Sequence, residues 1–156
     1  MAEKKITNDF FNDYLLVGIA SQLKEYKFCF HLNTLLGTDF IKLKDLIFQS
    51  PNRTRDAQFS VFKAGTEDDK NQFFVFSNKN LQNVLLPEIS RFDYLIQIFG
   101  KYEPEDVAIL MQGIRNFPNV VMTAVIPLNK VKSKDRLIYL EEKTPQKLMN
   151  SKRFKQ

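Results

Sequence analysis

The segment YLIQIF, residues 94–99, constrains the fold most strongly because both of its alternating faces are mostly apolar. In an extended strand, Tyr94, Ile96 and Ile98 point to one side, while Leu95, Gln97 and Phe99 point to the other. A strand with one wet face would instead alternate apolar and polar residues. The segment therefore predicts a central strand in a sheet that is covered on both faces.

Turn signals divide the region before this strand into short elements. Residues 14–20, YLLVGIA, are too few for a typical helix and contain Gly18, so they predict a buried strand. A helix is predicted over residues 22–36, with Ser21 as its N-cap and Gly37 as its left-handed C-terminal residue. Its apolar residues cover more than one stripe, which predicts a heavily buried helix.

The remaining elements follow from similar patterns. Residues 39–48 alternate at first and predict a short, edge-like strand, and two aromatic runs around AGTEDDK predict a β-hairpin. A helix is predicted from Pro104, because acidic residues follow the proline and apolar residues then recur at helical spacing. Residues 120–126, VVMTAVI, predict a strand, and RLIYL, residues 136–140, predicts a last short one.

Together these elements predict an α+β fold. We expect a two-layer sandwich in which a largely antiparallel sheet of about five to six strands carries two main helices. The chain has no internal repeat and no linker-like segment, so residues 1–142 are predicted to form a single domain. Residues 143–156 are predicted to be a basic, disordered tail.

The charge of the chain is concentrated near its C-terminal end. The formal net charge is +5, but residues 143–156 contain five basic and no acidic residues: Lys143, Lys147, Lys152, Arg153 and Lys155. Without them the chain has 18 basic and 18 acidic residues. A second basic cluster precedes the tail and consists of Lys130, Lys132, Lys134 and Arg136. The positive charge is therefore weak evidence for a nucleic-acid-binding domain.

Several kinds of site have no support in the sequence. Cys29 and His31 are the only residues of their types, and on a helix they lie about 200° apart, so we expect no metal site. No glycine-rich phosphate loop is present, and we expect no cofactor. The chain shows no signal-peptide pattern and no apolar run of membrane-spanning length, which predicts a cytoplasmic protein that does not enter a membrane.

Glu88 and Asp93 are the carboxylates whose role the sequence leaves open. In the structural interpretation, Pro87 opens one helical turn with Glu88 in it, and Asp93 precedes the central strand that starts at Tyr94. In the functional interpretation, Glu88, Asp93 and Tyr94 form a catalytic or small-ligand site, with Arg91 as a charge partner. We favour the structural interpretation, because ion-pair networks often perturb acids without catalysing a reaction.

The motif around these residues resembles that of a known family. Leu86-Pro87-Glu88, then three residues, then Phe92-Asp93-Tyr94 is similar to the pattern that names the IPExxxVDY family, with Leu86 for Ile and Phe92 for Val. The segments VGIASQLKEYKFCFHLN and NKVKSKDRLIYL also resemble the regions that flank the motif in that family. The resemblance implies a one-domain cytoplasmic protein of Bacteroidetes-type bacteria, and it assigns neither an activity nor a catalytic residue.

The leading hypothesis from the sequence is a small non-enzymatic domain that acts through contact with a protein or a nucleic acid. One alternative is a small-ligand binder or an enzyme that uses the Glu88 and Asp93 region. The other alternative is RNA binding through residues 130–156, where lysine and arginine would contact phosphates. The oligomeric state is left open.

Overall fold

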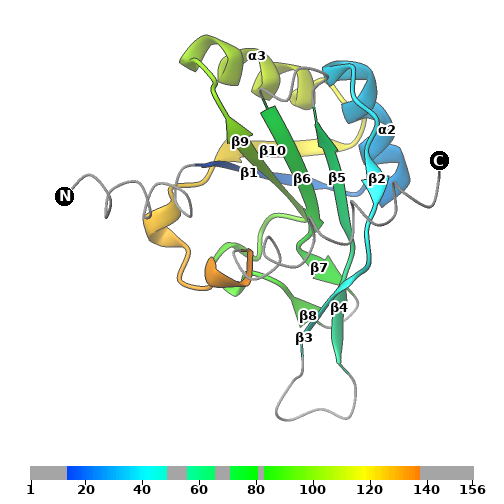
Figure 1. The fold of residues 1–156 in the computed structure, drawn as a ribbon, viewed down its shortest axis with the longest axis vertical. Coiled ribbons are helices and arrows are strands. Elements are labelled where there is room, and N and C mark those ends of the chain that lie inside the picture. Colours follow the sequence, from blue (N-terminus) through cyan, green and yellow to red (C-terminus); the bar gives the residue numbers. More distant parts are fainter. Residues whose placement is uncertain (1–13, 49–55, 66–70, 81–82, 138–156) are drawn as a thin grey trace.

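The computed structural model describes residues 14–48, 56–65, 71–80 and 83–137. Its main feature is a six-stranded antiparallel sheet with the strand order β10-β1-β9-β6-β5-β2 (Figure 1). The strands are β1 Tyr14–Ser21, β2 Ile41–Lys42, β5 Val61–Gly65, β6 Asn71–Ser77, β9 Tyr94–Gly100 and β10 Val120–Val125. The predicted α+β class and the predicted size of the sheet are confirmed.

Strand β9 is a central strand, as its two apolar faces predict. It pairs with β1 on one side and with β6 on the other, so that Gln97 lies between Leu16 and Phe74. The side chain of Gln97 is fully buried, and neither of its amide atoms has a hydrogen-bond partner among the described residues. This amide is therefore an uncompensated polar group in an otherwise apolar layer.

Two helices cover one face of the sheet: α2, Glu25–Leu36, and α3, Pro104–Arg115 (Figure 1). Phe28 and Leu32 of α2 share a core with Ile114 of α3 and with the sheet residues that face the helices. Helix α2 ends at Gly37, which has the predicted left-handed conformation with φ of 67°.

The two helices approach each other closely because one of them carries a glycine at the contact. A Cβ atom added to Gly113 of α3 would lie 2.6 Å from Leu35 Cδ1 of α2. Real Cβ contacts are essentially never that short, so a larger residue at this position would require the side chain of Leu35 to move.

The opposite face of the sheet is covered by short segments. They are the strand pair β3 Leu46–Phe48 and β4 Ala57–Phe59, the pair β7 Lys79–Asn80 and β8 Asn83–Val84, and the 3₁₀ turns η1 Pro87–Ile89 and η2 Leu128–Lys130. In Figure 1, β3, β4, β7 and β8 lie at the end of the molecule away from the helices. These segments and their neighbours bury Phe59, Leu85 and Leu137 together with Leu16 and Phe74. The sheet is thus buried on both faces.

Helix α2 differs from its prediction in two ways. It begins at Glu25 and not at residue 22, because the hydroxyl of Ser21 accepts a hydrogen bond from the N–H of Leu23 at 3.0 Å, ahead of the helix. The helix is also not buried all round. Tyr26 is 66% exposed and Phe30 is 64% exposed on its outer side, so the prediction of a heavily buried helix is wrong.

Two strand predictions also change. Residues 39–48 contain two short strands, β2 and β3, which join different partner strands. Arg136 and Leu137 lie in a helical turn, where their N–H groups bond locally to the carbonyls of Ser133 and Lys134. The strand prediction is therefore wrong for these two residues, while residues 138–140 and the predicted tail, 143–156, lie outside the described residues. None of the described helices is long and apolar enough to cross a membrane.

Candidate functional sites

The motif residues 86–94 form a turn that leads from β8 into β9. Pro87 is at the first position of η1, where its missing N–H does not remove a helical hydrogen bond. Leu86 and Phe92 are buried in the core on the face of the sheet away from the helices. The predicted helical turn at Pro87 is confirmed.

Glu88 contacts a segment 45 residues further along the chain. Its Oε2 accepts a hydrogen bond from the backbone N–H of Ser133 at 2.5 Å, and its Oε1 accepts one from the Ser133 hydroxyl at 3.1 Å. Glu88 is exposed, and its slight desolvation raises its pKa. The hydrogen bonds from Ser133 and from the backbone N–H groups of Glu88 and Lys132 outweigh this effect, so the pKa lies below its ordinary value. Glu88 therefore acts as an anchor for the turn after η2.

Asp93 makes a similar contact with a different part of the chain. Its Oδ2 accepts a hydrogen bond from the backbone N–H of Ser21 at 2.7 Å, at the end of β1. Its Oδ1 lies 3.4 Å from the ammonium group of Lys79. The backbone N–H of Asp93 also donates to the carbonyl of Ile19 at 2.8 Å. Asp93 thus holds the start of β9 against the end of β1.

Tyr94 extends this contact to the start of α2. Its hydroxyl donates a hydrogen bond to the carbonyl of Leu23, and its ring stacks on Phe28 with centroids 4.5 Å apart. Burial raises the pKa of Tyr94 above its ordinary value, and electrostatic interactions with Glu25, Cys29 and Asp93 add to this effect. The phenol remains protonated and acts as a donor, so it is not suited to be a general base.

Asn78 holds the motif turn together, and the sequence analysis missed it. The residue is fully buried, and its Nδ2 donates to the carbonyls of Ile89 at 3.1 Å and Phe92 at 2.9 Å. Its Oδ1 accepts from the N–H of Leu86 at 2.8 Å. The sequence offers only an asparagine at the end of an aromatic strand, which resembles an ordinary strand end.

The two motif carboxylates do not form a working pair. Glu88 bonds to Ser133, while Asp93 bonds to Ser21 and pairs with Lys79, so each has its own structural partner. Arg91 is exposed and makes no ion pair with either carboxylate in the described structure. Two carboxylates that act together as general acid and general base must both reach one reacting group. The geometry of the described residues favours the structural interpretation.

Cys29 and His31 take part in packing. Cys29 is buried, and its burial together with the charge of Glu25 raises the pKa of the thiol to about 12. His31 packs against the ring of Phe117, with centroids 5.1 Å apart. Within the part of the chain that the structure describes, no three His, Cys, Asp or Glu residues are grouped so as to hold a metal ion.

The basic cluster before the tail divides into two kinds of residue. Lys130 and Lys132 are exposed. Arg136 instead lies over the ring of Phe48, 5.1 Å from its centroid, and donates a hydrogen bond to the carbonyl of Leu85. Lys134 is half-buried. The five basic residues of the predicted tail lie outside the described residues. The described part of this region therefore has two exposed lysines, Lys130 and Lys132, with which to contact the phosphates of an RNA.

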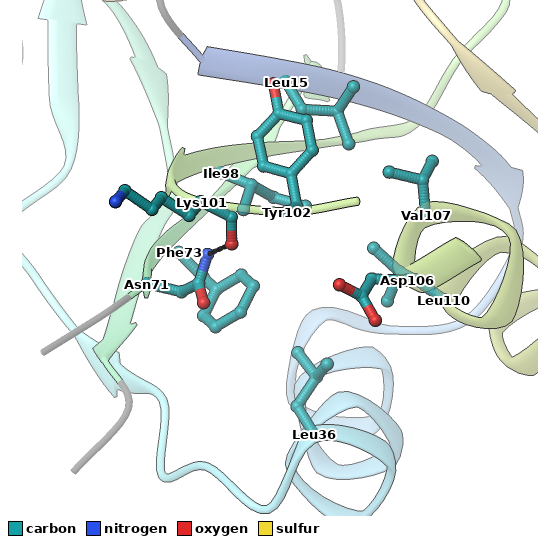
Figure 2. Close-up of a pocket in the computed structure, with 10 residues that line it drawn as sticks. All are labelled: Leu15, Leu36, Asn71, Phe73, Ile98, Lys101, Tyr102, Asp106, Val107 and Leu110. Atoms are coloured by element: carbon teal, nitrogen blue, oxygen red, sulfur yellow. Dashed lines mark hydrogen bonds between the residues drawn. The ribbon is translucent and has the colours of Figure 1, made fainter. Parts of the chain in front are cut away.

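A pocket of about 140 Å³ lies between the helices and the sheet, and no residue of the motif 86–94 lines it (Figure 2). It is lined mainly by apolar side chains, and three polar residues, Asn71, Lys101 and Asp106, also line it. No local sequence pattern predicts this site, because its lining residues come from β1, α2, β6, β9, the segment between β9 and α3, and the start of α3.

The sheet has two edges of different character. The edge strand β2 has two residues, one of which is Lys42. The other edge strand, β10, has six residues, VVMTAV, and carries no charged side chain. Three of its residues are exposed large hydrophobics: Val121 at 81%, Met122 at 37% and Val125 at 44%.

No protein-family model matches the sequence of this chain, and none of the curated proteins searched matches it.

Proposed function

We propose that this chain is a non-enzymatic binding domain whose partner is an extended segment of another protein, added as a strand to the free edge of β10. The observation that carries the proposal is the six-residue, uncharged and partly exposed edge of this strand. Strand addition is a common mode of peptide recognition, because a sheet edge offers unpaired backbone donors and acceptors.

The direction of the backbone groups supports this mode of binding. The N–H of Ile126 donates to the carbonyl of Leu16 at 2.8 Å, so this pair is hydrogen-bonded between β10 and β1. Hydrogen-bonded and non-bonded pairs alternate along antiparallel strands. The backbone N–H and C=O groups of Thr123 and Val125 therefore point away from β1, toward the free edge.

A bulge in β10 adds an apolar contact beside these groups. The register between β1 and β10 shifts where Ala20 pairs with Met122 and Ser21 pairs with Val120, which leaves Val121 without a partner on β1. Val121 is also the most exposed large hydrophobic residue in the described structure. Bulges often re-aim a side chain at sheet edges. We infer that Val121 and Val125 contact apolar side chains of the added strand.

The role of the motif residues supports a binding domain rather than an enzyme. Glu88, Asp93 and Tyr94 each bond to the backbone of a distant segment, and so they are used to hold the fold. We further propose that the chain belongs to the IPExxxVDY family and works in the bacterial cytoplasm. The compact unit that the motif forms supports the family proposal, and the single buried thiol of Cys29 supports the location.

Site-specific photo-crosslinking in the native host tests the proposed function. A photoreactive phenylalanine analogue replaces Val121 in one protein and Arg91, which is exposed in the motif turn, in a control protein. We expect a defined protein adduct from position 121 and none of the same mass from position 91. The absence of an adduct at position 121, or identical adducts at both positions, would contradict the proposal.

Two further variants show whether the contact uses the backbone edge. Val125→Pro removes an outward N–H, while the bonds of Ala124 and Ile126 to β1 remain. Val125→Thr keeps both the N–H and the β-branched shape. We expect Val125→Pro to abolish the adduct at position 121 and Val125→Thr to preserve it, with both variants checked for cooperative unfolding. An adduct that Val125→Pro leaves unchanged would exclude strand addition at this edge.

A further inference from the structure

The pocket between the helices and the sheet has the form of a small-molecule site. Its apolar wall combines residues of the sheet with residues of both helices, including Phe73, Ile98, Leu36 and Leu110. Ligand sites are typically concave and apolar, with a small number of polar groups that fix the orientation of the ligand. The pocket meets this description and lies in a different part of the domain from the β10 edge.

One carboxylate is directed into this space. Figure 2 shows the carboxylate of Asp106 turned toward the cavity beside Leu110, whereas the ammonium group of Lys101 points away from it. Asp106 is held in place, because its Oδ2 accepts a hydrogen bond from the backbone N–H of Glu103 at 3.1 Å in a capping box. Its Oδ1 accepts no hydrogen bond from the described residues.

The charges that line the pocket favour a cation. Lys101 and Asp106 are its charged lining residues, and Figure 2 shows the carboxylate of Asp106 nearer to the cavity than the ammonium group of Lys101. No ion pair joins Lys101 to Asp106 in the part of the chain that the structure describes. A positively charged group of a ligand can therefore meet Asp106 without displacing an existing partner. Charge-assisted hydrogen bonds to a carboxylate are stronger than neutral ones.

The volume limits the apolar part of the ligand. Cavities of about 150 Å³ lined by Leu, Ile and Phe hold a molecule of the size of benzene. The present pocket, at about 140 Å³, is of similar size. A ligand that fills it has one compact apolar group, and a nucleotide or a sugar phosphate is too large and has the wrong charge.

We propose that this pocket binds a small primary amine, with the apolar group between Phe73 and Leu110 and the ammonium group on Asp106. The amine donates to Oδ1 of Asp106, and the apolar group displaces water from the wall of the pocket. The specificity is then for a cation over a neutral or anionic molecule of the same shape.

Three probes of similar shape test the proposal on the full chain: benzylamine, benzyl alcohol and benzoate. Each probe is titrated at pH 7, and its binding is measured from the NMR signals of the side-chain methyl groups. We expect benzylamine to shift the methyl signals of Leu15, Leu36 and Leu110 and to bind about fivefold more tightly than benzyl alcohol. Benzoate is expected to bind more weakly than either. The proposal would be overturned if the amine and the alcohol bound equally tightly, or if the amine shifted methyl signals outside the pocket instead of those that line it.

A matched pair of variants assigns the charge to one residue. Asp106→Asn keeps an oxygen that can accept from the Glu103 N–H, so the helix cap is preserved while the charge is removed. Glu105→Gln removes a charge from the same helical turn, and Glu105 does not line the pocket. Because Asp106 is exposed, we expect Asp106→Asn to weaken benzylamine about fivefold, to the level of benzyl alcohol, and Glu105→Gln to change it less than about twofold. Equal effects of the two variants would overturn the assignment to Asp106.

Discussion

The ring of Phe92 lies directly against the backbone of Gly18, so that a Cβ atom added to Gly18 would be 2.6 Å from Phe92 Cγ. The two residues are far apart in the sequence, in the motif turn and in β1, respectively. The contact explains why a glycine interrupts an otherwise apolar strand: only a residue without a side chain leaves space for the ring.

Gly18→Ala is expected to destabilise the protein by about 2 kcal/mol, because the added methyl group overpacks the contact with Phe92. Phe92→Val, which introduces the family's residue, removes part of the ring and leaves room for this methyl group. Gly18→Ala should therefore be less harmful in the Phe92→Val background, with a coupling of about 1 kcal/mol. Urea unfolding of the native protein, the two single variants and the double variant measures this coupling. If the two effects on the free energy of unfolding are additive, the contact with Phe92 is not the cause of the loss of stability in Gly18→Ala.

Asn78→Ala is expected to destabilise the protein by about 3 kcal/mol, because the carbonyls of Ile89 and Phe92 and the N–H of Leu86 lose their partner in the interior. Asn129→Ala is the control, since Asn129 is exposed in η2. This control should change the free energy of unfolding by less than about 0.5 kcal/mol. If both substitutions have similar small effects, Asn78 does not hold the motif turn.

Gln97→Met is expected to stabilise the protein by about 1 kcal/mol. The amide of Gln97 is buried without a hydrogen-bond partner among the described residues, and Met has a similar volume without the polar group. Chemical unfolding of the two proteins under identical conditions measures the difference. A clear loss of stability in Gln97→Met would mean that the amide is satisfied in the folded protein.

The bond from Ser133 to Glu88 should make stability depend on pH. The pKa of Glu88 is below its ordinary value of 4.5 in the folded protein, so the folded state binds the proton less readily than the unfolded state. Its contribution is fully present above about pH 5 and is lost as the pH falls through the folded pKa. It should be below about 1 kcal/mol, because Glu88 is exposed.

Comparison of the native protein with Glu88→Gln measures this contribution. The difference in the free energy of unfolding should be constant between about pH 5 and 7 and should shrink at lower pH. A difference that grows as the pH falls would contradict the assigned direction.

Cys29 should react slowly while the protein is folded. A thiol pKa of about 12, against an ordinary value of 9.0, lowers the thiolate fraction at pH 8 by about 1,000-fold, and burial adds a steric barrier. Iodoacetamide labelling followed by mass spectrometry should therefore be slow in buffer and fast in denaturant. Rapid labelling of the folded protein would show that α2 separates readily from the core and exposes Cys29 to solvent.

Several elements could be predicted from the sequence because their signals are local. The apolar faces of residues 94–99 specify a central strand, Gly37 ends α2 in the left-handed conformation, and Pro104 with the acids after it starts α3. Each of these signals depends on backbone preferences within a few residues, which hold whatever the rest of the chain does. The same local reasoning failed for the outer side of α2, because burial of Tyr26 and Phe30 depends on what packs against the helix.

Only the tertiary structure decided what the motif carboxylates contact and where a ligand or a partner would bind. Glu88 meets a residue 45 positions away, and Asp93 meets one 72 positions away. Such pairs arise when strand order and register bring distant segments together, and no periodicity within a segment encodes them. The pocket at Asp106 and the edge of β10 that no other described strand covers have the same origin, since both exist only after six strands and two helices have taken their places. The sequence by itself determined the central strand, the end of α2 and the start of α3, and long-range packing determined the candidate sites.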